Sequence, residues 1–162
     1  MKKIILLLTS IVLSLILISC TSTVANVKAQ EAEAAKLAAD VKAGGYKLIA
    51  TTELKKMIDE KQKVLIISAL PVNDDKSSGI IPSAVNGEMP KSEKDLTPAQ
   101  KENLLKAAGS DKNKTIVVYC GFTACRRSHI GASILVAGGY RNIYRYAEGI
   151  KAWTEKGYTV NK

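Results

Sequence analysis

Apolar residues in this chain fall into short continuous runs, and segments with helical spacing separate these runs. We interpret the runs at 63–68 (KVLIIS), 115–119 (TIVVY) and 142–146 (NIYRY) as buried strands, and we expect a shorter strand around 84–86. Helices are predicted over 53–60, 97–109, 128–139 and 149–157, whereas the stretch 71–79 is predicted to be a loop. The alternation predicts an α/β fold, in which helices cover both faces of a parallel sheet.

The helix predicted over 97–109 carries the most complete set of local signals. Thr97 is suited to the N-cap, Pro98 to the first helical position, and Gln100 completes a capping box. Gly109 is expected to end the helix, because glycine readily takes the backbone conformation found after a helix.

The first residues are typical of an export signal. Two lysines precede an apolar run over 4–18, which is short for a membrane-spanning helix. The run ends in LISC (17–20), which resembles the lipobox of bacterial lipoproteins. We therefore expect residues 1–19 to be a signal peptide and Cys20 to be lipidated. A plain signal anchor and a conventional cleavage site are the alternatives.

The rest of the chain divides into a spacer and a folded domain. Residues 20–45 are rich in Ala, Lys and Glu, which predicts a lipidated cysteine followed by a helical or a disordered spacer. The domain is expected over 46–162. These features indicate a protein of the bacterial cell envelope that is lipid-anchored to a membrane. By resemblance to enterobacterial sorting, Thr21 after the cysteine favours an outer membrane, facing the periplasm, where one exists.

The chain has a formal net charge of +9, which limits its classes of partner. Lysine pairs are spread along the whole sequence, and no basic stripe with interleaved aromatic residues suggests nucleic acid. Such a surface suits contact with anionic lipid headgroups, and it attracts anionic substrates modestly.

Cys120 directly follows the buried run 115–119. In a parallel α/β sheet, ligands bind at the carboxyl ends of the strands, and this cysteine is expected there. A short loop, 121–127, then leads into a helix. Backbone N–H groups of such a loop and of the helix start can face an anion, and the same field lowers the pKa of a thiol. The pattern therefore indicates a nucleophilic thiol at the mouth of an anion site, although a buried structural cysteine is the plainer interpretation.

At this point the chain resembles the rhodanese-like (sulfurtransferase) domain family. The resemblance rests on VVYC at 117–120, on GGY at 138–140, on NIY at 142–144, on GI and AW at 149–153, on GY at 157–158 and on the segment 79–86. It implies a single domain with a five-stranded parallel sheet, and it implies that Cys120 forms a persulfide in sulfur transfer. The implied partners are a small sulfur-containing anion or persulfide donor and a thiol acceptor or reductant protein, with no cofactor and no metal.

The predicted site combines two catalytic cysteines with an anion-binding loop. Cys120 is the expected nucleophile and Cys125 a resolving thiol, which would release reduced sulfur and leave a disulfide. The expected substrate- and anion-binding residues are Gly121, Phe122, Thr123, Ala124, Arg126 and Arg127. His129 is predicted to be a solvated residue at the helix start, with a general acid or a third ligand to a metal as alternatives.

Several positions depart from the family pattern and leave other functions open. Ser68 and Leu70 stand where the family commonly has Asp and Arg, and Ile80 stands where it commonly has His. The spacing from Cys120 to Arg126 also fits phosphatases and arsenate reductases of the same fold. A stable Cys120–Cys125 disulfide would instead make the domain a non-catalytic binding module.

Overall fold

The computed structural model describes residues 25–162, so Cys20 and the predicted signal peptide lie outside the described residues. The chain forms two compact units, one ending at Ala38 and one that comprises Ala39–Lys162. Residues 25–44 are helical. The second unit starts before residue 46, so it includes the last residues of the stretch predicted to be a spacer. From residue 25 onward, the helices lack the combination of length and apolar character that a membrane crossing requires.

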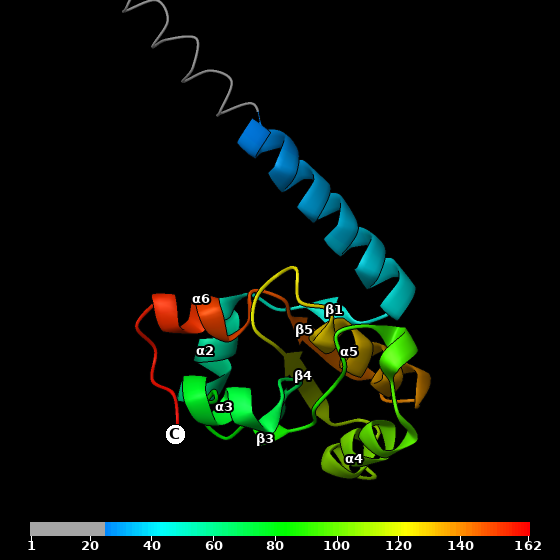
Figure 1. Cartoon of the computed structure of the whole chain (residues 1–162). Coiled ribbons are helices and arrows are strands. Elements are labelled where there is room, and N and C mark those ends of the chain that lie inside the picture. The colour runs from blue at the N-terminus through cyan, green and yellow to red at the C-terminus, as the bar shows by residue number, and fades with distance from the viewer. Residues whose placement is uncertain (1–24) are drawn as a thin grey trace, which may run out of the picture. The chain divides into compact units, whose positions relative to one another are not determined.

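Five parallel strands form the sheet at the centre of the second unit (Figure 1). Their order is β1-β5-β4-β2-β3, and each neighbouring pair runs parallel. Their bounds are β1 Lys47–Leu48, β2 Val64–Ser68, β3 Val85–Asn86, β4 Thr115–Tyr119 and β5 Asn142–Tyr146. The predicted α/β fold with a five-stranded parallel sheet is confirmed.

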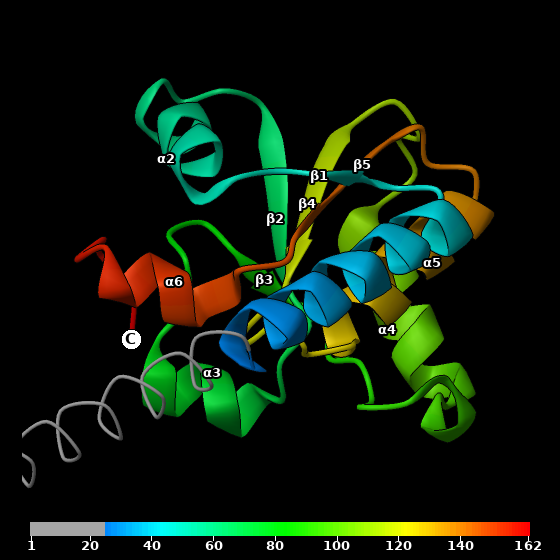
Figure 2. The same ribbon diagram turned by 90° about the horizontal axis from the view of Figure 1, so that it is seen from above.

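Burial explains why the central strands are almost entirely apolar. The last four residues of β4 are buried, and the strand lies between β2 and β5 with helices on either side. Figure 2 shows α2 and α6 on one side of the sheet and α4 and α5 on the other. A strand covered on both faces has no solvent side, and its sequence therefore shows a continuous apolar run without alternation.

The helices begin and end close to the predicted positions. Their bounds are α2 Thr51–Asp59, α4 Pro98–Ala108, α5 Arg127–Ala137 and α6 Gly149–Glu155, and a short 3₁₀ helix, η1, spans Glu93–Asp95. The capping box of α4 is complete. The Gln100 N–H donates to Thr97 Oγ1 at 3.2 Å, and the Thr97 N–H donates to Gln100 Oε1 at 3.1 Å. The local signals alone therefore located this helix.

The prediction of a loop over 71–79 is wrong in part, because Val72–Ser78 form a helix, α3. Its sequence, VNDDKSS, has no apolar periodicity that would indicate a helix. Pro71 is its N-cap residue, and the acidic Asp74 and Asp75 in the first turn favour the positive end of the helix dipole. Asp75 is buried, so the helix is held by polar contacts rather than by an apolar face.

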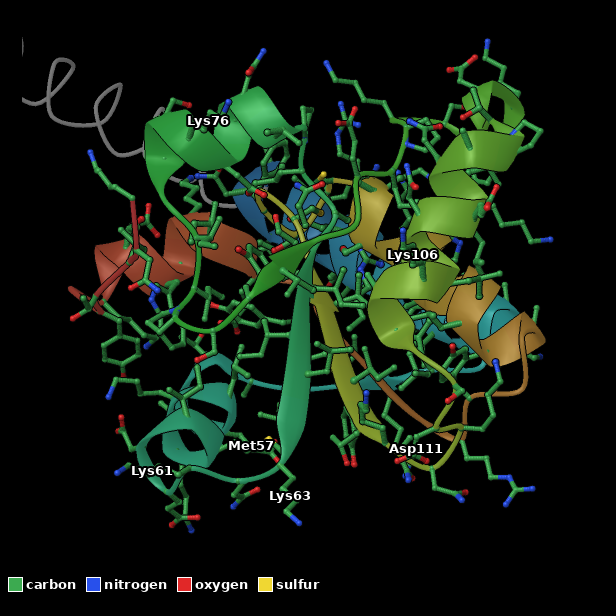
Figure 3. The ribbon with its side chains drawn as sticks, turned by 90° about the horizontal axis from the view of Figure 1, so that it is seen from below. Met57, Lys61, Lys63, Lys76, Lys106 and Asp111 are labelled. Atoms are coloured by element: carbon green, nitrogen blue, oxygen red, sulfur yellow. The ribbon has the colours of Figure 1, made fainter. Side chains whose placement is uncertain are left out.

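The surface lysines are distributed around the domain. Figure 3 labels Lys61 and Lys63 in the turn before β2, Lys76 on α3 and Lys106 on α4, and all four are exposed. No dense basic stripe forms among these four positions, in agreement with the spread of lysines along the sequence.

Candidate active site

Cys120 lies where β4 ends, at the carboxyl edge of the sheet. The last residue of β4, Tyr119, is paired with Ser68 on one side and with Tyr146 on the other. The Cys120 thiol is completely buried. It donates to the backbone oxygen of Cys125 at 3.3 Å, and its Sγ lies 3.1 Å from Ser128 Oγ. The thiol is therefore enclosed by the loop that follows it and by the first turn of α5.

The start of α6 holds the backbone of this loop from the other side. The N–H groups of Ile150 and Lys151 donate to the backbone oxygens of Cys120 (2.9 Å) and Gly121 (3.0 Å). Gly149 makes the close approach possible, because it has φ +69° and a Cβ there would lie 2.4 Å from the Cys120 oxygen. The glycine is thus required by the geometry of the site.

Cys125 is the more accessible of the two thiols, and both are free. The pKa of Cys125 is lowered to about 5, first by the neighbouring Cys120 thiol and then by the N–H groups of Gly121 and Arg127 and the Arg127 charge, while burial opposes them. Burial raises the pKa of the Cys120 thiol well above its ordinary value, and Cys125 adds to the rise. The pKa values of the two thiols are therefore shifted in opposite directions, which favours the thiolate form of Cys125 over that of Cys120.

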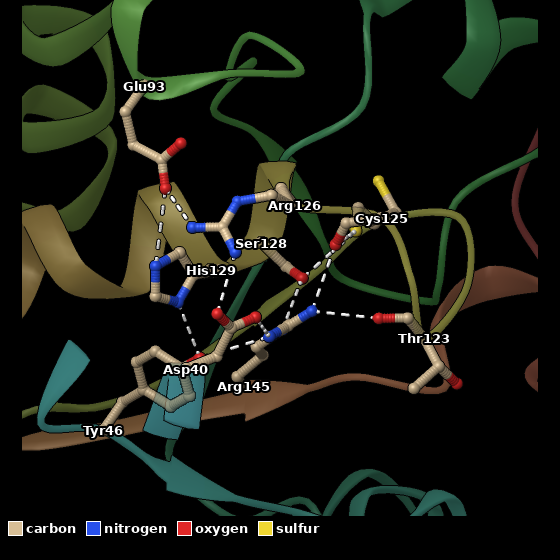
Figure 4. Close-up of polar contacts among 10 residues, drawn as sticks. Asp40, Tyr46, Glu93, Thr123, Cys125, Arg126, Ser128, His129 and Arg145 are labelled. Carbon is tan, nitrogen blue, oxygen red and sulfur yellow. Dashed lines mark hydrogen bonds and ion pairs between the residues drawn. The ribbon is translucent and has the colours of Figure 1, made fainter. Parts of the chain in front are cut away.

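The side chain of Arg145, on β5, is the main support beneath the loop (Figure 4). It is 1% exposed. Its donors reach five acceptors: Ser128 Oγ (3.0 Å), the backbone oxygens of Thr123 and Cys125 (both 3.1 Å), Tyr46 Oη (3.2 Å) and Asp40 Oδ2 (3.3 Å). The sequence alone did not identify this residue as part of the site. The one available signal was a cation inside the otherwise apolar and aromatic strand NIYRY.

Arg126, which is predicted to bind an anion, has its guanidinium in contact with carboxylates of the protein itself. Its guanidinium donates to Asp40 Oδ1 at 2.8 Å and to Glu93 Oε1, so two carboxylates of the protein already occupy it. A cation at the start of a helix is unfavourable without an anion, and these carboxylates supply one. Arg127 donates from Nη1 to the backbone oxygen of Met89, while its own N–H faces the Cys125 thiol.

The remaining loop residues surround the thiols without adding a charged group. Gly121 and Thr123 are half-buried, and Ala124 is exposed. Phe122 is 53% exposed, so its ring points largely into solvent. The loop therefore presents its backbone to the thiols, while its largest side chain lies outside.

His129 is buried, and the prediction of a solvated helix-start residue is wrong. Its Nδ1 lies 2.8 Å from Tyr46 Oη, and its Nε2 lies 3.6 Å from Glu93 Oε1. Burial lowers the pKa of His129, and the charges of Arg126 and Arg145 lower it further. The nearby carboxylates of Asp40 and Glu93 oppose this shift. Residues 25–162 contain no group of three or more His, Cys, Asp and Glu side chains that could hold a metal ion.

A buried carboxylate lies beside Ser68, where the family commonly has Asp. Ser68 Oγ donates to Asp75 Oδ1 at 2.7 Å, and Asn86 Nδ2 donates to Asp75 Oδ2 at 2.7 Å and to the Leu70 oxygen at 2.9 Å. Burial raises the pKa of Asp75 despite these hydrogen bonds. Helix α3 thus supplies an acid next to β2 that the strand itself lacks.

Comparison with known proteins assigns the family. The model of the rhodanese-like domain matches residues 50–156, and the chain belongs to this family. No curated protein matches the chain.

Solved structures agree on the fold. A polysulfide-sulfur transferase homodimer from Wolinella succinogenes is 19% identical with a TM-score of 0.58, and the match covers 78% of this chain and 84% of that chain. The human single-domain sulfurtransferase is 21% identical with a TM-score of 0.50 (67% and 96% covered). A protein of unknown function from Rhodopseudomonas palustris, described as a possible tyrosine phosphatase, is 16% identical with a TM-score of 0.54 (76% and 92% covered). At these identities the likeness concerns the fold alone.

Proposed function

We propose that the domain is a sulfurtransferase that acts on sulfane sulfur through the thiols of Cys120 and Cys125. One observation carries the proposal: two free thiols share the loop at the carboxyl edge of the sheet, and the neighbouring thiol together with backbone N–H groups lowers the pKa of the accessible one to about 5. A thiolate surrounded by N–H donors is suited to attack a sulfur atom in an anionic donor. Polysulfide and thiosulfate are donors of this class.

In the first step, the Cys125 thiolate attacks the sulfane sulfur of the donor. A bond forms between Cys125 Sγ and that sulfur, the sulfur–sulfur bond of the donor breaks, and its electron pair leaves with the rest of the donor. Transfer is complete when an acceptor thiolate removes the outer sulfur from Cys125 and restores the thiolate.

Cys120 offers a second outcome for the persulfide. After losing its proton it attacks Cys125 Sγ, the outer sulfur leaves as hydrosulfide, and a Cys120–Cys125 disulfide forms. An external dithiol then reduces this disulfide with two electrons. The reaction therefore requires a reductant protein or a small thiol as partner.

This order reverses the one expected from the sequence, in which Cys120 carries the persulfide and Cys125 resolves it. Two observations support the reversal. Cys120 is completely buried, and burial raises its pKa, whereas Cys125 is partly exposed and its pKa is lowered. The position of Cys120 at the strand end, where the family nucleophile falls, is the argument for the original order.

The phosphatase alternative receives less support. It needs the Arg126 guanidinium to hold an oxyanion above a thiolate, but that guanidinium is paired with Asp40 and Glu93. The binding-module alternative needs a stable disulfide, and both thiols are free here.

Peptide mapping of two single-cysteine variants tests the proposal and the order of the thiols together. C120S and C125S are reduced, treated with inorganic polysulfide, trapped with an alkylating agent and digested. We expect a persulfide on Cys125 in C120S and little or none on Cys120 in C125S. A persulfide that accumulates only on Cys120 would restore the original order, and no persulfide in either variant would contradict the proposed function.

We further propose that the protein is lipid-anchored through Cys20 to a membrane of the bacterial cell envelope, with the domain facing the periplasm in a cell with two membranes. What supports this is the sequence LISC at 17–20 alone. Growth with a labelled fatty acid should label the wild-type protein and leave C20S unlabelled, and equal labelling of both would contradict the anchor.

A further inference from the structure

We propose that Arg145 is a positioning residue, which holds the loop of residues 121–127 and the Ser128 hydroxyl in the arrangement that the two thiols need for sulfur exchange. The inference rests on the proposed function, because it concerns how that site is built. None of the five hydrogen bonds of Arg145 goes to a thiol, so its role is to act through the groups that contact the thiols.

The contacts of Arg145 account for its whole guanidinium. A guanidinium has five N–H donors, and the side chain makes five hydrogen bonds. Three of the acceptors belong to the loop and to the start of α5. They are the backbone oxygens of Thr123 and Cys125 and the hydroxyl of Ser128. A planar fork of this kind determines the orientation of each acceptor as well as its position.

Two of these acceptors contact the Cys120 thiol directly. The backbone oxygen of Cys125 also accepts from the Cys120 thiol at 3.3 Å, and Ser128 Oγ lies 3.1 Å from Cys120 Sγ. Because Arg145 Nε donates to Ser128 Oγ, the hydroxyl hydrogen remains free to point to the Cys120 sulfur when that sulfur becomes a thiolate. Arg145 thereby favours the charged form of the thiol that must attack the persulfide.

The peptide planes explain how the same residue keeps the loop open to an anion. A trans peptide has its C=O and the following N–H on opposite sides. With the oxygens of Thr123 and Cys125 turned to Arg145, the N–H groups of Ala124 and Arg126 point away from the guanidinium. Without Arg145 these carbonyl groups lose their cationic partner and can rotate toward the thiols, where they would repel a thiolate.

Asp40 holds the guanidinium in turn. Its carboxylate bridges Arg145 (3.3 Å) and Arg126 (2.8 Å), and its side chain is 13% exposed. A buried cation needs such a partner, since removing an unpaired charge from water is strongly unfavourable. The acid comes from the last part of the helix at 25–44, which the sequence analysis assigned to the spacer.

The test follows the reactivity of Cys125 toward iodoacetamide as a function of pH in the full chain, which reports on the loop and does not require sulfur transfer. R145K retains a positive charge but cannot reach the same set of acceptors. We expect its alkylation rate near pH 6 to fall about tenfold, because displaced loop carbonyl groups would raise the pKa of Cys125 above its wild-type value of about 5 and leave less thiolate at that pH. R141K is the matched control, because Arg141 is exposed and donates to an Asn113 side chain.

The outcomes separate this inference from the proposed function. Circular dichroism first establishes that R145K is folded. An alkylation profile of R145K equal to that of the wild type would overturn the positioning role, whatever the result of the sulfur-transfer assays. If R145K does not fold, the S128A variant replaces it, and the rate of sulfide release from the Cys125 persulfide is compared between S128A and the wild type. An equal rate in the two proteins would overturn the inference. A wild-type protein that gains no sulfur atom from polysulfide would contradict the proposed function. The comparison of Cys125 alkylation rates between R145K and the wild type would still test the role of Arg145.

Discussion

The Cys120 thiol donates to the backbone oxygen of Cys125 at 3.3 Å. This contact places the two cysteines of one loop side by side, with the buried one at the strand end and the accessible one near the start of α5. The spacing of five residues therefore produces a dithiol whose members have opposite shifts in pKa.

Cys125 should react with alkylating agents before Cys120. Its pKa is lowered to about 5, so the thiolate is present above that pH and is lost as the pH falls through it. A brief treatment with iodoacetamide near neutral pH should modify Cys125 alone, as measured by peptide mapping. C120A should react more slowly below neutral pH, because the Cys120 thiol contributes most to the lowering of the pKa of Cys125 and an alanine side chain has no hydrogen-bond donor. Preferential labelling of Cys120 would contradict the assigned order.

Gly149→Ala should destabilise the domain and disrupt the site. The residue has φ +69°, and the new Cβ would lie 2.4 Å from the Cys120 oxygen, so the backbone of the thiol loop has to move. We expect a loss of about 2–5 kcal/mol in the free energy of unfolding, measured with urea.

Gly157→Ala is the matched control for this substitution. Gly157 has φ +72°, but nothing lies within 4 Å of the place that an alanine methyl group would take, so only the backbone conformation opposes alanine there. The expected loss is about 1–2 kcal/mol, and sulfur uptake should be retained. Equal effects of the two substitutions would show that contact with the Cys120 backbone is unimportant.

Asp40→Asn should make stability less dependent on pH in the acidic range. Burial raises the pKa of Asp40, but the Arg126 hydrogen bond and the charges of His129, Arg126 and Arg145 outweigh it, and the net pKa is lowered. A lowered pKa contributes stability above the unfolded value of 3.8, and this contribution is lost as the pH falls through the folded value. We expect D40N to be about 1–3 kcal/mol less stable near neutral pH, with a smaller further loss on acidification.

Urea unfolding of D40N and the wild type at several pH values measures this difference. D59N is a suitable control, because Asp59 pairs with Lys55 on the surface of α2 and a surface pair contributes little. A parallel decline of D40N and the wild type on acidification would contradict the role given to Asp40.

Arg126→Gln should leave sulfur uptake within about threefold of the wild type, although it removes two ion pairs. The reason is that the Arg126 guanidinium binds carboxylates of the protein and does not face the thiols. Initial rates with polysulfide measure the effect. A loss of uptake in a folded R126Q variant would return Arg126 to the anion-binding role that the sequence suggested.

Local patterns were sufficient to predict the central strands, the capped helix α4 and the place of Cys120. Each of these depends on neighbours in the sequence, such as an apolar run or a capping box. Helix α3 was missed because its stability depends on buried polar contacts of Asp75, which no periodicity reveals.

The support of the site could not be predicted, because it joins residues that are far apart in the chain. Asp40 and Arg145 are separated by 105 positions, and Tyr46 and His129 by 83. Without the fold, Asp40 belonged to a polar helix and Arg145 to a strand with one unexplained cation. The burial of His129 likewise depends on its contact with Tyr46.

Sulfur transfer through Cys120 and Cys125 is tested most directly by the intact mass of the reduced wild-type protein during treatment with a limiting amount of inorganic polysulfide, with sulfide measured in parallel. We expect the protein to gain one sulfur atom, to release it as sulfide, and to end with both thiols lost to a disulfide that a dithiol reopens. A mass that stays unchanged while both thiols remain open to alkylation would refute sulfur transfer through this pair of cysteines.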